Sequence, residues 1–266
     1  MRRRGRVGNP GRSWDEELFA TVGDDYDHVF AAEVAETEKQ AAFAARLLGL
    51  RLGQRVLDLC CGAGRHSLAL ARQGFLPTGV DREPRLLALA RQRAAASGVT
   101  VQWVEADARR LPYLGLFHGA LCLFASWGYA ADVMENARVL GQVADRLLPG
   151  SRLLLDIPNV LWLHQHPMGH QWAVQGGTAV HEARRFNVST STLEVRWHLL
   201  RTGNEPWEGL ARYRVLDVRS LQVLAGRYGL TLEAAYGDFE GRPLTSETPR
   251  ALLLLRRTLP LGSARR

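Results

Sequence analysis

A glycine-containing turn at residues 60–64, Cys-Cys-Gly-Ala-Gly, constrains the fold of this chain more than any other feature. The apolar run 56–59 ends in this turn, and a helical pattern of apolar residues follows at 65–71. Strand, tight turn and helix in this order form the nucleotide-binding corner of a doubly wound α/β sheet, where ligands lie beyond the carboxyl ends of the strands. Gly62 and Gly64 can adopt a positive φ without a Cβ clash, so backbone amides can approach a ligand. The sequence therefore predicts an α/β, Rossmann-like fold with a ligand site at this turn.

Three acidic residues, Asp58, Asp81 and Asp107, stand at the ends of successive apolar runs. A loop that grips phosphate avoids nearby carboxylates because anions repel one another, so Asp58 favours a ligand with a cationic portion. Asp81 is placed to pair with the hydroxyls of a ribose, and Asp107 to accept hydrogen bonds from an adenine amino group. S-adenosylmethionine has a ribose, an adenine and a positive amino-acid end, and it has no phosphate. It fits this arrangement.

Four segments, in order, resemble motifs of the class I S-adenosylmethionine-dependent methyltransferases. They are similar to the glycine-rich motif, the ribose-binding acidic tip, the adenine motif and the turn into the fifth strand of that family, at 56–66, 79–82, 105–108 and 147–156. The order and spacing of four motifs are far more specific than a lone Gly-x-Gly. The resemblance implies a Rossmann-like methyltransferase sheet that binds S-adenosylmethionine.

The Cys-Gly-x-Gly-Arg-His turn resembles one branch of that family, many of whose enzymes have no assigned substrate. Ser-Trp-Gly-Tyr at 126–129 and the segment 236–241 resemble the same branch. One position departs from the family pattern, because Cys60 replaces the usual glycine. The resemblance implies the following cofactor-binding residues: Tyr26, Asp58, Cys60, Cys61, Gly62, Gly64, Asp81, Arg82, Asp107, Ala108 and Phe124.

The order of periodic patterns predicts six segments. They are a disordered basic arm at 1–13, an N-terminal helical cap at 14–53, the cofactor core at 54–156, a β insertion or lid at 157–216, a C-terminal completion of the sheet at 217–258 and a flexible tail at 259–266. In the core, strands are expected at 55–59, 76–80, 101–105, 118–123 and 152–156, with helices between them that include 132–147. The remaining expected elements are a helix at 217–228 and strands at 230–239 and 249–257.

The insertion is expected to hold three antiparallel strands, at 178–188, 191–201 and 207–216. Their alternating residues present one apolar face, made by Phe186, Val188, Leu193, Val195, Trp197 and Leu199. Such a face is too large to leave in water, so it must cover the mouth of the active site or meet a second subunit. The sequence predicts a lid that also contributes to a homodimer.

Three histidines, His164, His166 and His170, follow the fifth predicted strand. Their spacing allows a zinc site, but no cysteine or acidic ligand accompanies them, so no metal is expected. Lining of the substrate pocket is the preferred interpretation, since loops at the carboxyl ends of strands face the ligand. His164, His166 and Tyr129 are the candidates for a general base, should an oxygen nucleophile need one.

The net charge of +7 and the sequence pI of 9.9 raise the alternative of a nucleic-acid substrate. However, Lys39 is the only lysine and Ile157 the only isoleucine, so the many arginines reflect the composition of a GC-rich genome. No apolar run approaches the roughly 20 residues of a membrane span. The three cysteines have no metal-ligand spacing and favour a reducing, cytoplasmic setting.

The sequence thus predicts a methyltransferase that uses S-adenosylmethionine on a nitrogen or oxygen atom of a small molecule. An RNA or other nucleic-acid methyltransferase is the main alternative. Two further alternatives are an NAD-dependent oxidoreductase, because Gly62-Ala63-Gly64 and Asp81 partly match a dinucleotide fingerprint, and a non-catalytic S-adenosylmethionine-binding protein. Against the oxidoreductase, Asp58 would repel a pyrophosphate.

Overall fold

The computed structural model describes residues 19, 35–130, 132–175, 177–201, 203 and 206–258. Tyr26, the expected basic arm at 1–13 and the expected tail at 259–266 lie outside these residues. Of the expected N-terminal cap, the structure describes a helix at Thr37–Leu48, α4, which ends at Gly49 in the left-handed conformation that glycine favours. Among the described helices none is long and apolar enough to span a membrane.

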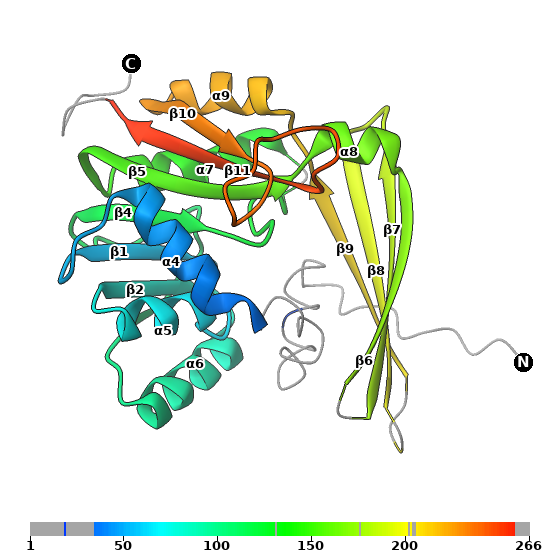
Figure 1. Ribbon diagram of the computed structural model, residues 1–266, viewed down its shortest axis with the longest axis horizontal. Helices are drawn as coiled ribbons and strands as arrows, with labels where there is room; N and C mark the ends of the chain where they lie inside the picture. Colours follow the sequence, from blue (N-terminus) through cyan, green and yellow to red (C-terminus); the bar gives the residue numbers. More distant parts are fainter. Residues whose placement is uncertain are drawn as a thin grey trace, which may run out of the picture.

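A seven-stranded sheet forms the centre of the molecule, with the strand order β10-β11-β5-β4-β1-β2-β3 (Figure 1). Neighbouring strands from β5 through β3 are parallel, whereas β11 is antiparallel to β5 and β10 is antiparallel to β11. The strands are β1 Arg55–Leu59, β2 Leu76–Asp81, β3 Gln102–Glu105, β4 Phe117–Cys122, β5 Leu147–Pro158, β10 Leu230–Tyr236 and β11 Arg250–Arg257. This mostly parallel α/β sheet confirms the predicted fold class.

Helices cover both faces of this sheet, which explains why its strands read as nearly continuous apolar runs. On β1, Val56 belongs to the buried cluster that includes α4 and α5 (Arg65–Arg72), while Leu57 belongs to the cluster that includes α7 (Val133–Ala144) and α9 (Val218–Gly226). The helix α6 (Pro84–Ser97) packs against β2 and β3. The carboxyl ends of the parallel strands therefore remain as the open edge of the sheet.

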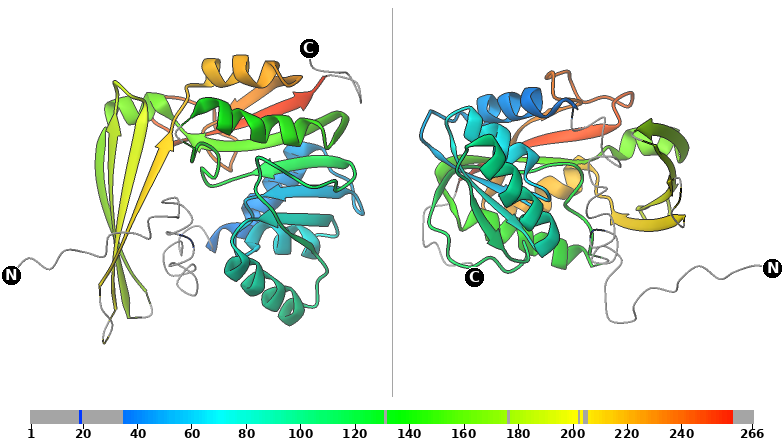
Figure 2. Two further views of the ribbon diagram at one scale, coloured as in Figure 1. Left: turned by 180° about the vertical axis from the view of Figure 1, so that it is seen from behind. Right: turned by 90° about the horizontal axis from the view of Figure 1, so that it is seen from below.

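A second sheet of four antiparallel strands lies beside that edge, in the order β6-β7-β8-β9 (Figures 1 and 2). The strands are β6 Met168–Gln175, β7 Thr178–Asn187, β8 Thr192–Arg201 and β9 Trp207–Arg214. The short helix α8 (Val160–Gln165) connects β5 to β6. Side chains alternate along β8, so that Leu193, Val195, Trp197 and Leu199 are all buried on one face.

The insertion contains one strand more than the three that the sequence predicts. The expected three correspond to β7, β8 and β9, and the additional strand is β6, in a segment that was expected to be a loop. β6 pairs with β7 alone, and its Trp172 and Val174 are 65% and 78% exposed, so it lacks the buried apolar alternation that identifies a strand. The expected apolar face is also corrected at Val188, which follows β7 and is 49% exposed.

Strand β5 is longer than expected at its start. It begins at Leu147 and includes the Pro149-Gly150 pair that the sequence assigns to a turn. Leu147 pairs with Phe117 on β4, and the register shifts before the next pair, Gly119 with Arg152. A bulge in the ladder therefore accommodates the two turn residues within the strand.

Candidate functional site

A cavity of about 930 Å³ lies between the carboxyl ends of the parallel strands and the buried face of the antiparallel sheet. Its strand-tip half is made by residues that follow β1, β2 and β3, namely Cys60, Gly62, Arg65, Asp81, Arg82, Ala106, Asp107, Ala108 and Arg109. Its sheet half is made by α8 and the antiparallel strands, namely Trp162, Leu163, Gln171, Trp172, Val180, Glu182, Arg184, Leu193, Val195, Trp197 and Tyr213. The segment 124–130, which follows β4, lines the cavity between the two halves.

The glycine turn after β1 has three residues with positive φ: Cys60 at 54°, Gly62 at 54° and Gly64 at 79°. A Cβ atom at Gly64 would lie 2.4 Å from Cη2 of Trp103, so only glycine fits there. Cys60, where the family pattern has glycine, adopts the same left-handed conformation at a cost of about 1–2 kcal/mol. The turn therefore keeps its shape despite the substitution.

Asp58 lies beneath this turn and is 2% exposed. Its Oδ2 accepts a hydrogen bond of 2.6 Å from the hydroxyl of Ser67, on the first turns of α5. Burial raises the pKa of Asp58 to about 7, although the Ser67 hydrogen bond and the Arg65 charge oppose the shift. The sequence predicts that Asp58 faces the ligand, but Asp58 is not among the residues that line the cavity. Its bond to Ser67 connects β1 to α5.

Asp81, at the tip of β2, lines the cavity with a carboxylate fixed from both sides. Its Oδ2 accepts from the backbone N–H of Gly62 at 2.7 Å, and its Oδ1 accepts from that of Glu83 at 2.9 Å. Burial raises the pKa of Asp81, and these two backbone donors oppose the shift. Each carboxylate oxygen can accept more than one hydrogen bond, so Asp81 can still receive a pair of hydroxyl groups.

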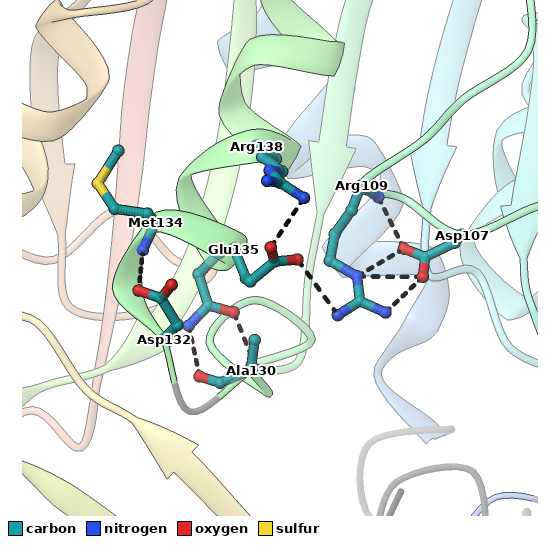
Figure 3. Close-up of polar contacts among 8 residues, drawn as sticks. Asp107, Arg109, Ala130, Asp132, Met134, Glu135 and Arg138 are labelled. Carbon is teal, nitrogen blue, oxygen red and sulfur yellow. Dashed lines mark hydrogen bonds and ion pairs between the residues drawn. The ribbon is translucent and has the colours of Figure 1, made fainter. Parts of the chain in front are cut away.

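Asp107 is engaged by Arg109, as Figure 3 shows. The guanidinium of Arg109 donates to both carboxylate oxygens, with an Nη2–Oδ2 distance of 2.5 Å, and its Nη1 lies 3.8 Å from Glu135 on α7. Burial raises the pKa of Asp107, but the bonds from Arg109 outweigh it and lower the pKa overall. An adenine amino group would therefore compete with Arg109 for the carboxylate of Asp107. The sequence does not predict this ion pair.

Phe124 and Ala125, just after β4, have φ of 60° and 52°, a conformation that side chains other than glycine rarely adopt. The guanidinium groups of Arg65 and Arg250 lie 3.8 Å and 5.0 Å from the centre of the Phe124 ring. Asp156 on β5 holds this segment, since its Oδ2 accepts from Phe124 N at 2.9 Å and from Arg250 Nη1 at 3.0 Å. Two cations thus flank one aromatic ring at the cavity wall.

Tyr129 lines the cavity, and its ring packs at 5.1 Å from that of Tyr213 and at 6.0 Å from that of Phe19. Trp127 is 4% exposed, and its Nε1 donates to the carbonyl of Asn136 at 2.9 Å. Tyr129 therefore packs against the sheet half of the cavity, whereas Trp127 is anchored mainly to α7.

The three histidines that were expected in the pocket are not among its lining residues. His164 packs near Phe186, and His166 stacks on Trp162 on an exposed surface. His170 lies on β6 and pairs with His181 at 3.2 Å, on the side of the sheet away from the buried Val180. This corrects the expected pocket role, because α8 and β6 replace the expected loop and turn these side chains outward.

His66 is buried, and burial together with the charge of Arg65 holds its pKa well below the usual value. Its Nε2 lies 3.1 Å from Oε1 of Gln40 on α4, which makes it a structural contact between two helices. In the described part of the chain, no cluster of three or more histidine, cysteine or acidic side chains is suited to a metal ion.

Seven of the eleven residues that the resemblance implies line the cavity: Cys60, Gly62, Asp81, Arg82, Asp107, Ala108 and Phe124. Asp58, Cys61 and Gly64 are not among the lining residues, and Tyr26 is outside the described residues. Asp156 and Arg250 also line the cavity and are not among the residues that the sequence predicts. A signal existed for Asp156, which ends an apolar run as Asp58 and Asp81 do.

Comparisons with known proteins agree with this architecture. Residues 56–150 match a family model described as a methyltransferase domain. A 2-phytyl-1,4-naphtoquinone methyltransferase from Synechococcus elongatus is 32% identical over 200 residues, which cover 67% of this chain and 80% of that protein. A demethylmenaquinone methyltransferase from Deinococcus radiodurans is 33% identical over 150 residues, 54% of this chain and 60% of that protein. A putative methyltransferase from Geobacillus is 29% identical over 109 residues, 41% of this chain and only 44% of that protein.

Solved structures share the fold over nearly the whole chain. An S-adenosylmethionine-dependent methyltransferase from Clostridium acetobutylicum superposes with a TM-score of 0.77, at 17% identity, and covers 91% of this chain and all of that one. The CcbJ methyltransferase from Streptomyces caelestis gives a TM-score of 0.76, at 21% identity over 91% of this chain and 96% of that one. Together with the 32% identity to the Synechococcus protein, these findings show that the chain belongs to the class I S-adenosylmethionine-dependent methyltransferases.

Proposed function

We propose that this protein transfers the methyl group of S-adenosylmethionine to a nitrogen or oxygen atom of a small molecule. The observation that carries the proposal is the two-part cavity, whose strand-tip half has Asp81 at the ribose position of the family motif and whose sheet half is a separate surface of mainly aliphatic and aromatic side chains. At about 930 Å³ the cavity is at the upper end of the range for small-ligand sites, which suits a cofactor and an acceptor together.

The residues of the strand-tip half fit the cofactor. The fixed carboxylate of Asp81 can accept hydrogen bonds from the two ribose hydroxyls, and the apolar Val80, Leu86 and Ala106 line the adjoining wall, where an adenine ring can lie. Arg65 supplies positive charge near the turn, which suits the carboxylate of the amino-acid end. When bound, S-adenosylmethionine supplies an activated methyl group on a sulfonium.

The contribution of the chain itself is to orient the acceptor and to exclude water. Orientation of two reactants can lower a barrier by roughly 7–11 kcal/mol. The ring of Tyr129 lines the cavity between the two halves, and the rings of Trp162 and Trp197 line the sheet half. Aromatic faces attract a cationic sulfonium. Where the nucleophile has to lose a proton, Tyr129, Tyr213 and Glu182 are titratable groups of this region that line the cavity.

The structural neighbours and quinone-methylating relatives support a small acceptor over a nucleic acid. The sheet half of the cavity is largely apolar, whereas nucleic-acid sites expose basic surfaces that track phosphates. The net charge of +7 still motivates the nucleic-acid alternative. The nucleic-acid alternative would be correct if label from S-adenosylmethionine entered RNA and none entered the small-molecule fraction of a cell extract.

Titration calorimetry tests the cofactor directly. We expect S-adenosylhomocysteine to bind and NAD to give no heat, because Ser67 stands where the dinucleotide-binding motif has its third glycine. Asp81→Asn should weaken S-adenosylhomocysteine binding by about 10- to 100-fold, the scale of a hydrogen bond to a charged group. The control is Glu105→Gln, since Glu105 pairs with Asp81 across the ladder but is exposed and outside the cavity lining. Tight NAD binding, or equal affinities for Asp81→Asn and Glu105→Gln, would overturn the proposal.

A further inference from the structure

The sheet half of the cavity has two charged side chains on one strand, Glu182 and Arg184, both on β7. They are two residues apart and therefore face the same side of the sheet. The other lining residues of β7, β8 and β9 are apolar or aromatic: Val180, Leu193, Val195, Trp197 and Tyr213. A charged pair within such a surface requires an explanation, because burial of a charge without a partner is costly.

Glu182 has a partner within the protein. Its Oε2 accepts a hydrogen bond of 3.2 Å from the indole Nε1 of Trp197 on β8, the residue that faces it across the ladder. Glu182 and Arg184 form no ion pair within 4.0 Å. The carboxylate is therefore fixed by an uncharged donor, and it does not neutralise the neighbouring guanidinium.

Arg184 is held in place with no acidic partner among the residues that the structure describes. Its guanidinium stacks on the ring of Trp162 at 4.3 Å, and its Nε is buried with no hydrogen-bond partner among the described residues. It lies against Gly169 on β6, where a Cβ atom would come within 2.5 Å of Nη2. A side chain at position 169 would displace the guanidinium. Gly169 and Trp162 therefore hold the guanidinium of Arg184 in one fixed position.

We infer that Arg184 binds an anionic group of the methyl acceptor, and that the acceptor is a small aromatic or otherwise apolar carboxylic acid. The planar fork of a guanidinium matches a carboxylate with two parallel hydrogen bonds, and stacking on Trp162 fixes the plane of the fork. The apolar surface of β8 and β9 would bury the body of the acceptor, and Glu182 would accept from a hydroxyl or amino group on it. This inference rests on the proposed methyltransferase function.

The chain offers a matched control for Arg184. Arg185 is the next residue on β7, carries the same charge and is exposed on the opposite side of the sheet. Arg184→Gln removes the cation from the cavity, whereas Arg185→Gln removes an equal charge from the outer surface. Any effect that is due only to the net charge of the protein would appear in both variants.

The test measures binding to protein saturated with S-adenosylhomocysteine, by the fluorescence of the cavity tryptophans and by calorimetry. The probes are benzoate and 4-hydroxybenzoate, with benzamide as the uncharged analogue of the same shape. We expect the two carboxylates to bind at least about tenfold more tightly than benzamide, since a charge-assisted pair exceeds a neutral one. Arg184→Gln should abolish this preference and leave S-adenosylhomocysteine affinity unchanged, while Arg185→Gln should behave as the wild type.

Equal binding of benzoate and benzamide by the wild type, no saturable binding of either carboxylate, or an unchanged preference in Arg184→Gln would each overturn the inference. Loss of S-adenosylhomocysteine binding in Arg184→Gln would also count against it, because Arg184 would then support the fold and not the acceptor. A wild type that binds no S-adenosylhomocysteine would contradict the proposed function instead. In a further test, the protein is incubated with labelled S-adenosylmethionine and with cell-extract metabolites that have been separated by charge. We expect label in compounds of the anionic fraction and none in the cationic fraction.

Discussion

At the scale of single residues, the acids at the strand tips have different tasks although the sequence presents them alike. Asp58 is buried beneath the turn with Ser67, Asp81 is fixed at the cavity by backbone amides, and Asp107 is bound by Arg109. All three end apolar runs, so position in the sequence indicates the strand tip but not the direction of the side chain. The direction is decided by partners such as Ser67 and Arg109.

Asp58 leads to a prediction on the pH dependence of stability. In an unfolded chain the aspartate pKa is about 3.9, whereas burial raises it to about 7 in the folded protein. Between these values the folded state holds a proton that the unfolded state has released. The free energy of unfolding therefore falls as pH rises, by up to about 1.4 kcal/mol per pH unit, and levels off above the folded pKa.

Urea unfolding of the wild type and of Asp58→Asn, at pH values from about 5 to 8.5, measures this effect. The stability of the wild type relative to the variant should decrease from pH 5 to pH 7 and then stay constant. Ser67→Ala, which removes a hydrogen bond that lowers the pKa, should move the plateau to higher pH. A difference that does not vary with pH would show that Asp58 is not buried as a titrating group.

At the scale of elements, the parallel strands could be predicted because their apolar runs are buried on both faces and end at glycine or acidic residues. The expected strand at 55–59 coincides with β1. β6 could not be predicted, since an edge strand with exposed Trp172 and Val174 gives no alternation of burial. The early start of β5 was also hidden, because the bulge that tolerates Pro149-Gly150 depends on pairing with β4, which lies far away in the sequence.

Asn159 connects the two sheets at the point where the chain leaves β5, and it is 3% exposed. Its Oδ1 accepts from Leu161 N at 3.0 Å as the N-cap of α8, and its Nδ2 donates to the carbonyls of Thr245 and Thr248 at 2.8 Å and 2.7 Å. One side chain therefore both starts α8 and holds the loop before β11. The two tasks use different atoms, which allows them to be separated by substitution.

We expect Asn159→Ala to lower the free energy of unfolding by about 2–3 kcal/mol, because it removes the cap and the two hydrogen bonds that Nδ2 donates to carbonyls. Asn159→Ser keeps an oxygen for the cap and should cost about 1 kcal/mol less than alanine. Denaturant unfolding followed by circular dichroism measures both values. Equal losses for serine and alanine would mean that the cap contributes nothing at this position.

At the scale of the whole molecule, the antiparallel sheet stands opposite the carboxyl ends of the central strands (Figure 2). The site exists only because residues of both sheets line one cavity. The sequence predicts the strand-tip half well, since a local motif encodes each tip. It predicts the sheet half only as an apolar face in need of a cover, because which surface covers it depends on how α8 turns the chain after β5. Buried side chains of that face line the cavity. The lid and the homodimer both stay predictions, and light scattering tests the homodimer.

The two-sheet construction predicts that cofactor binding and methyl transfer can be separated by one substitution. Val195 on β8 lines the cavity and is 6% exposed, and the following residue, Arg196, is exposed on the outer side of the same strand. Val195→Arg should project a long cation into the sheet half and displace the acceptor. Because misplacement of a reactant by about 1 Å can cost 100-fold in rate, we expect methyl incorporation from labelled S-adenosylmethionine into extract metabolites to fall at least about tenfold.

S-adenosylhomocysteine affinity should stay within about twofold of wild type, since the strand-tip half is made by the other sheet, and Arg196→Ala should change neither quantity. Loss of S-adenosylhomocysteine binding in a Val195→Arg protein with a native circular dichroism spectrum would show that the two halves do not act separately.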